Sequence, residues 1–126
     1  MKDKITFAPV IPLIGGFPLG AEMALGYAPE AIYSYKGFEG NDSHYVNYQQ
    51  ETKGRDVKYL HIADQENPDP IDIAMCTPPC AGLSSFNSSS NPEASGAGCA
   101  KNDWMYISIT DAIEKLKAKV VLVENA

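Results

Sequence analysis

A cysteine stands where an apolar segment meets two prolines, and it is the side chain best placed to do chemistry. Residues 71–75, Ile-Asp-Ile-Ala-Met, have the composition of a strand, and Pro78 and Pro79 end it because proline cannot continue a hydrogen-bonded ladder. Cys80 follows at once. Ligands in open α/β sheets collect beyond the carboxyl ends of strands. The position therefore predicts a nucleophilic thiol, and the alternative is a small buried apolar side chain.

A glycine pair follows the first apolar segment. Residues 5–13 are expected to form a strand, which its two prolines make irregular or push toward an edge of the sheet. Gly15 and Gly16 then form a turn, and a helix is expected from Pro18 to Gly26. Backbone can approach a ligand closely at such a turn, where free N–H groups favour an anion such as a carboxylate. A glycine turn of this kind also occurs without any ligand.

The C-terminal quarter of the chain predicts a helix and a strand. Asp103 is expected to cap an amphipathic helix, and residues 120–123 are β-branched enough to form a buried parallel strand. The apolar face of the helix is expected to comprise Met105, Ile109, Ala112, Ile113 and Leu116. Before it, residues 84–101 form a long Ser- and Gly-rich loop of the kind that serves as a lid or is disordered.

Strand and helix patterns alternate along the whole chain. This alternation predicts an α/β fold, a Rossmann-like doubly wound parallel sheet of about five strands in the order 3-2-1-4-5. The remaining expected elements are strands at 31–35 and 59–62 and a short helix at 43–50 that Asp42 or Ser43 would cap. In this order the site lies between the ends of the first and fourth strands, and Glu124 ends the fifth.

Acidic residues follow the second and third expected strands. Nucleotide-binding folds use an acid at the end of the second strand to hold ribose hydroxyls, and both Glu39 and Asp42 are candidates. Asp64 lies near the end of the third strand.

Composition restricts the class of protein. The 126 residues, 44% of them hydrophobic, suit one domain with a real core, and no run is apolar and long enough for a membrane span. Three cysteines are an odd number, which favours a reducing cytoplasm over a disulfide framework. With 10 Lys+Arg against 16 Asp+Glu, the net charge of −6 has the wrong sign for a surface that binds nucleic acid by itself.

Three motifs, in order and spacing, resemble those of the DNA cytosine-5 methyltransferases. Residues 11–20, Ile-Pro-Leu-Ile-Gly-Gly-Phe-Pro-Leu-Gly, look like the family's cofactor motif Phe-x-Gly-x-Gly-Gly-Phe-x-Leu-Gly. Residues 79–84, Pro-Cys-Ala-Gly-Leu-Ser, look like the nucleophile motif Pro-Cys-Gln-x-x-Ser, and residues 124–126 look like Glu-Asn-Val. The resemblance covers residues 1–126 as the N-terminal part of a methyltransferase catalytic domain, with 84–101 as its catalytic-type loop.

The resemblance implies the methyltransferase fold, S-adenosyl-L-methionine as cofactor and double-stranded DNA as partner of the complete enzyme. It assigns catalytic roles to Cys80, Glu124 and Asn125. The Cys80 thiolate would add to C6 of a flipped cytosine, and Glu124 would protonate N3, so that C5 can accept the methyl group. The implied cofactor-binding residues are Ile14, Gly15, Gly16, Phe17, Leu19, Glu39 or Asp42, Asp64 and Pro79.

The chain also departs from the family pattern. Leu13 stands where the first motif glycine is expected, so the turn should differ slightly, and Ala81 replaces the motif glutamine. The family's basic segment, target-recognition domain and C-terminal helix have no counterpart in these 126 residues. The expectation is therefore a truncated or split methyltransferase piece, inactive alone, that self-associates or needs a complementary half. A non-catalytic piece that binds cofactor or a complementary subunit is the alternative.

Three further functions are compatible with parts of the sequence. A cysteine hydrolase would use Cys80 with His44 or His61 as base, although neither histidine lies in a recognisable motif. A zinc site of Cys76, Cys80 and Cys99 lacks a fourth ligand and paired spacing. A phosphate-binding NTPase is disfavoured because no Gly-Lys-Ser/Thr follows the glycines.

Overall fold

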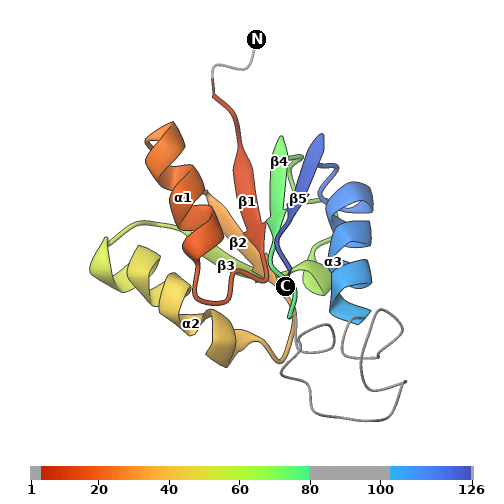
Figure 1. Cartoon of the computed structure of the whole chain (residues 1–126), viewed down its shortest axis with the longest axis horizontal. Helices are drawn as coiled ribbons and strands as arrows, with labels where there is room; N and C mark the ends of the chain where they lie inside the picture. Colours follow the sequence, from red (N-terminus) through yellow and green to blue (C-terminus); the bar gives the residue numbers. More distant parts are fainter. Residues whose placement is uncertain (1–3, 80–102, 126) are drawn as a thin grey trace.

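The computed structural model describes residues 4–79 and 103–125, and its centre is one parallel sheet (Figure 1). The strand order is β3-β2-β1-β4-β5, and every neighbouring pair is parallel. This confirms the predicted fold class and strand order. The strands are β1 (Phe7–Val10), β2 (Ala31–Ser34), β3 (Lys58–His61), β4 (Ile73–Cys76) and β5 (Val120–Val123).

Helices cover both faces of the sheet. Figure 1 shows α1 (Gly16–Leu25) and α2 (Glu39–Asn47) on one side and α3 (Asp103–Glu114) on the other. A π-helical turn, η1 (Tyr48–Thr52), continues α2, and a 3-10 turn, η2 (Ile62–Asp64), follows β3. Within the described parts of the chain, no helix is both long and apolar enough to cross a membrane.

Alternating strand side chains build a core on each face of the sheet. Val10, Tyr33 and Ala74 belong to the larger core, together with Ala112 and Leu116 from α3 and the residues just after it. Ile32, which neighbours Tyr33 in β2, belongs to a smaller core with Tyr45 and Val57. This period of two is the one that a strand covered on both faces requires.

The first strand lies in the centre of the sheet, so the expectation that prolines push it toward an edge is wrong. Its peptide groups alternate between neighbours: the Val10 carbonyl accepts from Thr77 N on the β4 side, and Ile11 N donates to the Tyr33 carbonyl on the β2 side. The missing N–H of Pro9 therefore falls on the β2 side. There the register comprises only Val10↔Tyr33, whereas β1 pairs with β4 over four residues.

Two helices differ in their bounds from the expected ones. Helix α1 ends at Leu25 as predicted, with Gly26 in the left-handed conformation at φ 87°, but it begins two residues before Pro18. Helix α2 begins at Glu39, four residues earlier than the expected helix. Asp42 consequently lies inside the helix and is fully buried, so it is not the helix cap.

The apolar face of α3 also differs from the expected one. Ser108, Ala112 and Leu116, spaced by four residues, are buried, whereas Ile113 is 56% exposed. In a helix Ile113 lies about 100° around the axis from Ala112, and this rotation takes it away from the sheet. The five predicted apolar positions therefore did not all face the core.

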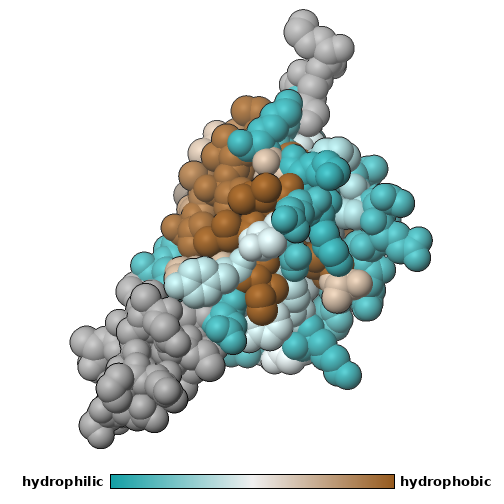
Figure 2. All heavy atoms as spheres, turned by 90° about the vertical axis from the view of Figure 1, so that its right-hand side faces the viewer, coloured by the Kyte–Doolittle hydropathy of each residue, from teal (hydrophilic) through white to brown (hydrophobic). Residues whose placement is uncertain are grey.

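The last strand is parallel as predicted, but it is not buried. Val120, Leu122 and Val123 are 48%, 41% and 40% exposed. The reason is that β5 ends the sheet order, so no described strand pairs with its outer edge. Figure 2 shows an apolar area on the side of the molecule where β5 and α3 lie, bordered by hydrophilic surface.

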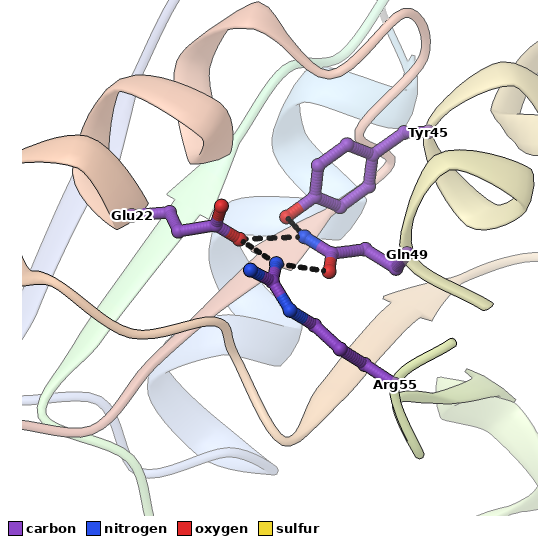
Figure 3. A network of polar contacts seen from close by, with 4 residues as sticks. All are labelled: Glu22, Tyr45, Gln49 and Arg55. Atoms are coloured by element: carbon purple, nitrogen blue, oxygen red, sulfur yellow. Dashed lines mark hydrogen bonds and ion pairs between the residues drawn. The ribbon is translucent and has the colours of Figure 1, made fainter. Parts of the chain in front are cut away.

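A polar network joins α1 to the chain after α2 (Figure 3). Glu22 Oε1 accepts from Arg55 Nη1 at 2.7 Å and from Gln49 Nε2 at 2.9 Å. Gln49 also accepts from Arg55 at 2.9 Å and donates to the Tyr45 hydroxyl at 3.0 Å. Gln49 is fully buried, so these bonds satisfy polar groups that water does not reach. The network fixes Tyr45, whose ring packs against the glycine turn.

Candidate functional site: the carboxyl edge of the sheet

The segments that carry the predicted site residues lie along one edge of the sheet. They follow the five strands in the order η2 after β3, the start of α2 after β2, the β1–α1 turn, residues 77–79 after β4, and residues 124–125 after β5. Neighbouring strands are about 4.8 Å apart, so the row is roughly 19 Å long. An elongated ligand could therefore contact several of these segments at once.

The two glycines of the β1–α1 turn have different surroundings. Gly15 has φ 93°, and a Cβ there would lie 2.2 Å from Tyr45 Cδ1. Packing alone therefore explains why residue 15 is glycine. A Cβ on Gly16 would meet no atom within 4 Å. Only Gly16 thus leaves open space that a ligand can approach.

The residue that departs from the family motif adopts the backbone conformation of a glycine. Leu13 has φ 55° and Ile11 has φ 55°, both in the left-handed region that side chains disfavour. What the geometry shows is a strained turn, at a cost of about 1–3 kcal/mol for each such residue. Strained backbone of this kind is concentrated at ligand sites.

Asp42 is committed to contacts within the chain. Its Oδ1 accepts from Leu13 N at 2.9 Å, and its Oδ2 accepts from the Ser34 hydroxyl at 2.5 Å and the Tyr59 hydroxyl at 2.7 Å. Burial, then the bond to Asp42, raises the pKa of Tyr59, which keeps that hydroxyl a donor. Asp42 thus holds the β1–α1 turn, β2 and β3 together from a fully buried position.

Glu39 is the accessible acid of the two candidates. Its carboxylate is 51% exposed and accepts from Gly37 N at 2.8 Å, and its pKa is lowered by backbone N–H groups of Glu39 and Gly37. His61 Nε2 lies 3.4 Å from Glu39 Oε1, and His61 Nδ1 lies 3.9 Å from Asp64 Oδ2. The structure therefore groups Glu39 and Asp64 around a histidine that the resemblance does not assign to the cofactor site. The sequence does contain a signal for His61, since it lies at the end of an expected strand and between two candidate acids.

His61 lies far from the strand that leads to Cys80. Two strands separate β3 from β4, which corresponds to about 14 Å at the spacing of a sheet. His44 lies on the exposed surface of α2. This arrangement gives no support to a cysteine hydrolase with His61 as base.

A hollow of about 410 Å³ lies between the β1–α1 turn and the ends of β4 and β5. Its volume is in the range of small-molecule sites, about 300–1,000 Å³. Three of the predicted cofactor residues, Ile14, Gly16 and Phe17, meet Glu124 there. Thr77 also lines the hollow, and the sequence analysis did not predict it. Leu19 is not part of the wall; its N–H donates to the Gly15 carbonyl at 3.0 Å. The described residues that line the hollow are Pro12, Leu13, Ile14, Gly16, Phe17, Thr77 and Glu124.

A larger hollow, of about 740 Å³, lies at the opposite end of the sheet. Thr6, Ala31 and Lys58, at or near the amino ends of three strands, are part of its lining. Among the predicted site residues that the structure describes, none lines it. Ligands of open α/β sheets bind beyond the carboxyl ends of strands, so the smaller hollow is the better candidate.

Asn125 connects β5 to the proline turn that precedes Cys80. Its Nδ2 donates to the Pro78 carbonyl at 3.4 Å and lies 3.5 Å from the Pro79 carbonyl oxygen. Glu124 N donates to the Cys76 carbonyl at 3.0 Å. These bonds fix Glu124 and Asn125 beside the end of β4, although Cys80 itself lies outside the described residues.

Cys76 is a separate thiol with a structural environment. It is fully buried, and burial raises its pKa to about 11, while its Sγ donates weakly to the Ser108 carbonyl at 3.9 Å. It is therefore protonated and unreactive at neutral pH. Residues 4–79 and 103–125 contain no group of three or more His, Cys, Asp or Glu side chains that could hold a metal ion; Cys80 and Cys99 of the zinc alternative lie outside these ranges.

Comparison with known proteins does not identify this chain. No family model matches its sequence, and no curated protein matches it.

Proposed function

We propose that this chain carries the cofactor-binding and nucleophile-bearing part of a DNA cytosine-5 methyltransferase. The observation that supports this most is the hollow, which brings Gly16 and Phe17 of the cofactor-like motif together with Glu124 of the Glu-Asn-like motif. Pro79, the residue before Cys80, is held beside it by Asn125. Motifs more than 100 residues apart in the sequence thus meet at one end of the sheet.

The described residues fit S-adenosylmethionine in their chemistry. Open space at Gly16 allows close approach of a ligand to the backbone, and Phe17 supplies an apolar wall. Glu39, exposed at the end of β2, has the carboxylate expected to hold ribose hydroxyls, and Asp64 lies one strand further along, where the adenine is expected. Asp42 is buried, so we assign the ribose contact to Glu39.

The proposed chemistry divides between β4 and β5. Cys80 would add its thiolate to C6 of cytosine, and Glu124 would donate a proton to N3, which makes C6 electrophilic. Asn125 would hold the proline turn and so position Cys80. S-adenosylmethionine would supply the methyl group that C5 accepts and would leave as S-adenosylhomocysteine; loss of the C5 proton to solvent would then break the C6–S bond, which releases the Cys80 thiolate and restores the aromatic ring. Addition at C6 requires the base to leave the duplex, because C6 is not accessible to a thiolate within stacked DNA.

Calorimetric titration with S-adenosylhomocysteine tests the cofactor site. We expect weak binding, with a Kd on the order of 1 mM. The reason is that the described residues would contact the ligand on one side and leave its other side exposed to solvent. Gly16→Val should abolish the binding by filling the hollow. Gly20→Val is the matched control: Gly20 also lies in α1 with no atom within 4 Å of a built Cβ, but it does not line the hollow. No heat at millimolar ligand, or equal loss in both variants, would contradict the site.

Covalent trapping tests the nucleophile. With a complementary C-terminal half of a family member supplied, the chain should form an adduct with DNA containing 5-fluorocytosine, and Cys80→Ser should abolish it. Cys76→Ser and Cys99→Ser should leave the adduct intact, the former because Cys76 is buried and protonated. An adduct that survives Cys80→Ser would refute this assignment.

The alternative is a non-catalytic methyltransferase piece that binds a complementary subunit. The apolar area on the side of β5 and α3 favours it, because exposed apolar surface of that kind marks interaction sites (Figure 2). The exposed large apolar side chains of these two elements are Tyr106, Ile107, Ile113, Val120, Leu122 and Val123. Turnover by the chain alone in a methyl-transfer assay would exclude this alternative.

Duplex DNA is proposed as partner only of the complete enzyme. The net charge of −6 gives this chain no attraction for phosphates, so we expect only non-specific DNA binding in a gel shift at low salt.

A further inference from the structure

Two buried side-chain oxygens lack a hydrogen-bond partner, and both lie at the ends of β4 and β5. Within residues 4–79 and 103–125, the buried side-chain polar atoms without a partner are Thr77 Oγ1 and Asn125 Oδ1. More than about 90% of buried polar groups in proteins are paired. Two exceptions at the ends of adjacent strands therefore require an explanation.

Hydrogen bonds fix both residues where they are. Thr77 is the first residue after β4, and its N–H donates to the Val10 carbonyl at 3.1 Å. Asn125 donates through Nδ2 to the carbonyls of Pro78 and Pro79, the two residues after Thr77. Because its amino group is used there, its carbonyl oxygen points elsewhere and is left over. The two orphan oxygens thus belong to one short stretch of the carboxyl edge.

Thr77 also lines the hollow, together with Gly16 and Glu124. Its Oγ1 is itself buried, although the residue lies at the wall of the hollow. A rotation about χ1, which moves a threonine between staggered rotamers, can turn the hydroxyl toward a ligand in the hollow.

The chemistry of these oxygens specifies the missing partner. An asparagine carbonyl only accepts hydrogen bonds, a threonine hydroxyl accepts as well as donates, and the exposed carboxylate of Glu124 accepts. None of the described residues that line the hollow is basic. The group that suits this arrangement is a hydrogen-bond donor, such as an amino group.

We infer that Thr77 Oγ1 accepts a hydrogen bond from an amino group of the ligand that enters the hollow. The inference rests on the proposed function, which offers two such groups near β4 and β5: the α-ammonium of S-adenosylmethionine and the exocyclic amine of cytosine. The adenine amine is a third, but the adenine is expected near Asp64, at the end of β3. Thr77 becomes a ligand-binding residue that none of the three motifs predicted.

The test compares Thr77→Val with Thr77→Ser and with Thr6→Val. Valine keeps the shape of threonine and removes the hydroxyl, whereas serine keeps the hydroxyl. Thr6 lies at the amino end of the sheet, where its Oγ1 donates to Asp72 Oδ2 at 3.3 Å and accepts from Asp72 N at 3.0 Å. Thr6→Val therefore loses two hydrogen bonds and should lower the free energy of unfolding. Thr77→Val removes a hydroxyl that has no partner, so it should not lower this free energy.

Titrations with S-adenosylhomocysteine, adenosine and 2′-deoxycytidine then identify the amino group. If the ammonium is the partner, Thr77→Val raises the Kd for S-adenosylhomocysteine about five- to tenfold, the value of one hydrogen bond. Adenosine, which lacks the amino-acid part, then binds both proteins equally, and Thr77→Ser and Thr6→Val bind as the wild type does. If the base amine is the partner, only 2′-deoxycytidine binds more weakly.

Different results would contradict the Thr77 contact and the methyltransferase function. Binding of both S-adenosylhomocysteine and 2′-deoxycytidine with the same affinity to wild type and Thr77→Val would overturn the inference alone. A wild-type chain that binds neither ligand would overturn the proposed function, and the inference with it.

Discussion

At the scale of single residues, Gly15 and Gly16 are adjacent glycines with different physical requirements. Gly15→Ala should destabilise the fold by about 2–4 kcal/mol, since it combines a left-handed backbone with an overpacked contact on the Tyr45 ring. Gly20→Ala, in open space within α1, should instead stabilise by about 0.5–1 kcal/mol. Urea unfolding measures both. Equal stabilities for the two variants would show that Tyr45 moves aside freely.

Asp42 and Asp64 are the same residue type in opposite environments: Asp42 is buried and hydrogen-bonded, and Asp64 is exposed to solvent. Asp42→Asn should lower the free energy of unfolding by about 2–4 kcal/mol, because an amide cannot accept from all three of its donors. Asp64→Asn, at a side chain 78% exposed, should change it by less than about 0.5 kcal/mol. Chemical denaturation of the two variants checks this. A tolerated Asp42→Asn would mean that Asp42 is not the structural centre of the turn.

At the scale of elements, the network of Figure 3 attaches α1 to η1. Arg55→Ala removes the cation from Glu22, whose side chain is 11% exposed, while the Arg55 side chain is 36% exposed. Because Arg55 is partly solvated, we expect a loss of about 1–3 kcal/mol, below the value for a fully buried pair. Lys53→Ala, which removes an exposed lysine near the Tyr48 ring, should cost less than about 0.5 kcal/mol. Comparable losses in thermal or urea unfolding would contradict the role of the network.

The elements also show what the sequence could predict. Alternation of apolar strands with helices was sufficient for the strand order, because connections in α/β folds follow few topologies. The sequence places the start of α2 too late because it favours Asp42 or Ser43 as the helix cap, whereas in the fold Asp42 is buried and bonds to Leu13, Ser34 and Tyr59. Such long-range partners leave no local pattern. Ile113 was misplaced because a helical repeat tolerates several apolar faces and tertiary packing selects one.

The candidate site was only partly predictable for the same reason. Gly16, Phe17 and Glu124 lie at one hollow, as the motifs implied, because motifs at strand ends converge in a parallel sheet. Gly15 is required by its close packing against Tyr45, and Asp42 is buried in the core. The same motif and strand-end arguments had predicted both as ligand-binding residues. Residue type and spacing indicate which segments meet, but burial decides which side chains remain available to a ligand.

At the scale of the whole molecule, β5 is a terminal strand whose outer edge no described strand pairs, and its side chains are apolar and partly exposed. A parallel strand at an edge presents unpaired N–H and C=O groups, and its exposed apolar side chains add a driving force for association. Sedimentation velocity should show the wild-type chain associating as its concentration rises. Leu122→Lys should shift it toward monomer because a charge on an edge strand opposes pairing. The substitution should lower the free energy of unfolding by only about 1 kcal/mol, since Leu122 is already 41% exposed.

Met23→Lys is the matched control for this surface. Met23 is 79% exposed and lies on α1, so the same change from an apolar side chain to lysine alters the net charge equally without touching β5. Association should therefore persist in Met23→Lys and weaken in Leu122→Lys. If both variants became monomeric alike, net charge rather than the β5 edge would control association. If the wild type stayed monomeric at high concentration, the apolar surface would require a different partner, and a complementary methyltransferase subunit would be the first one to test.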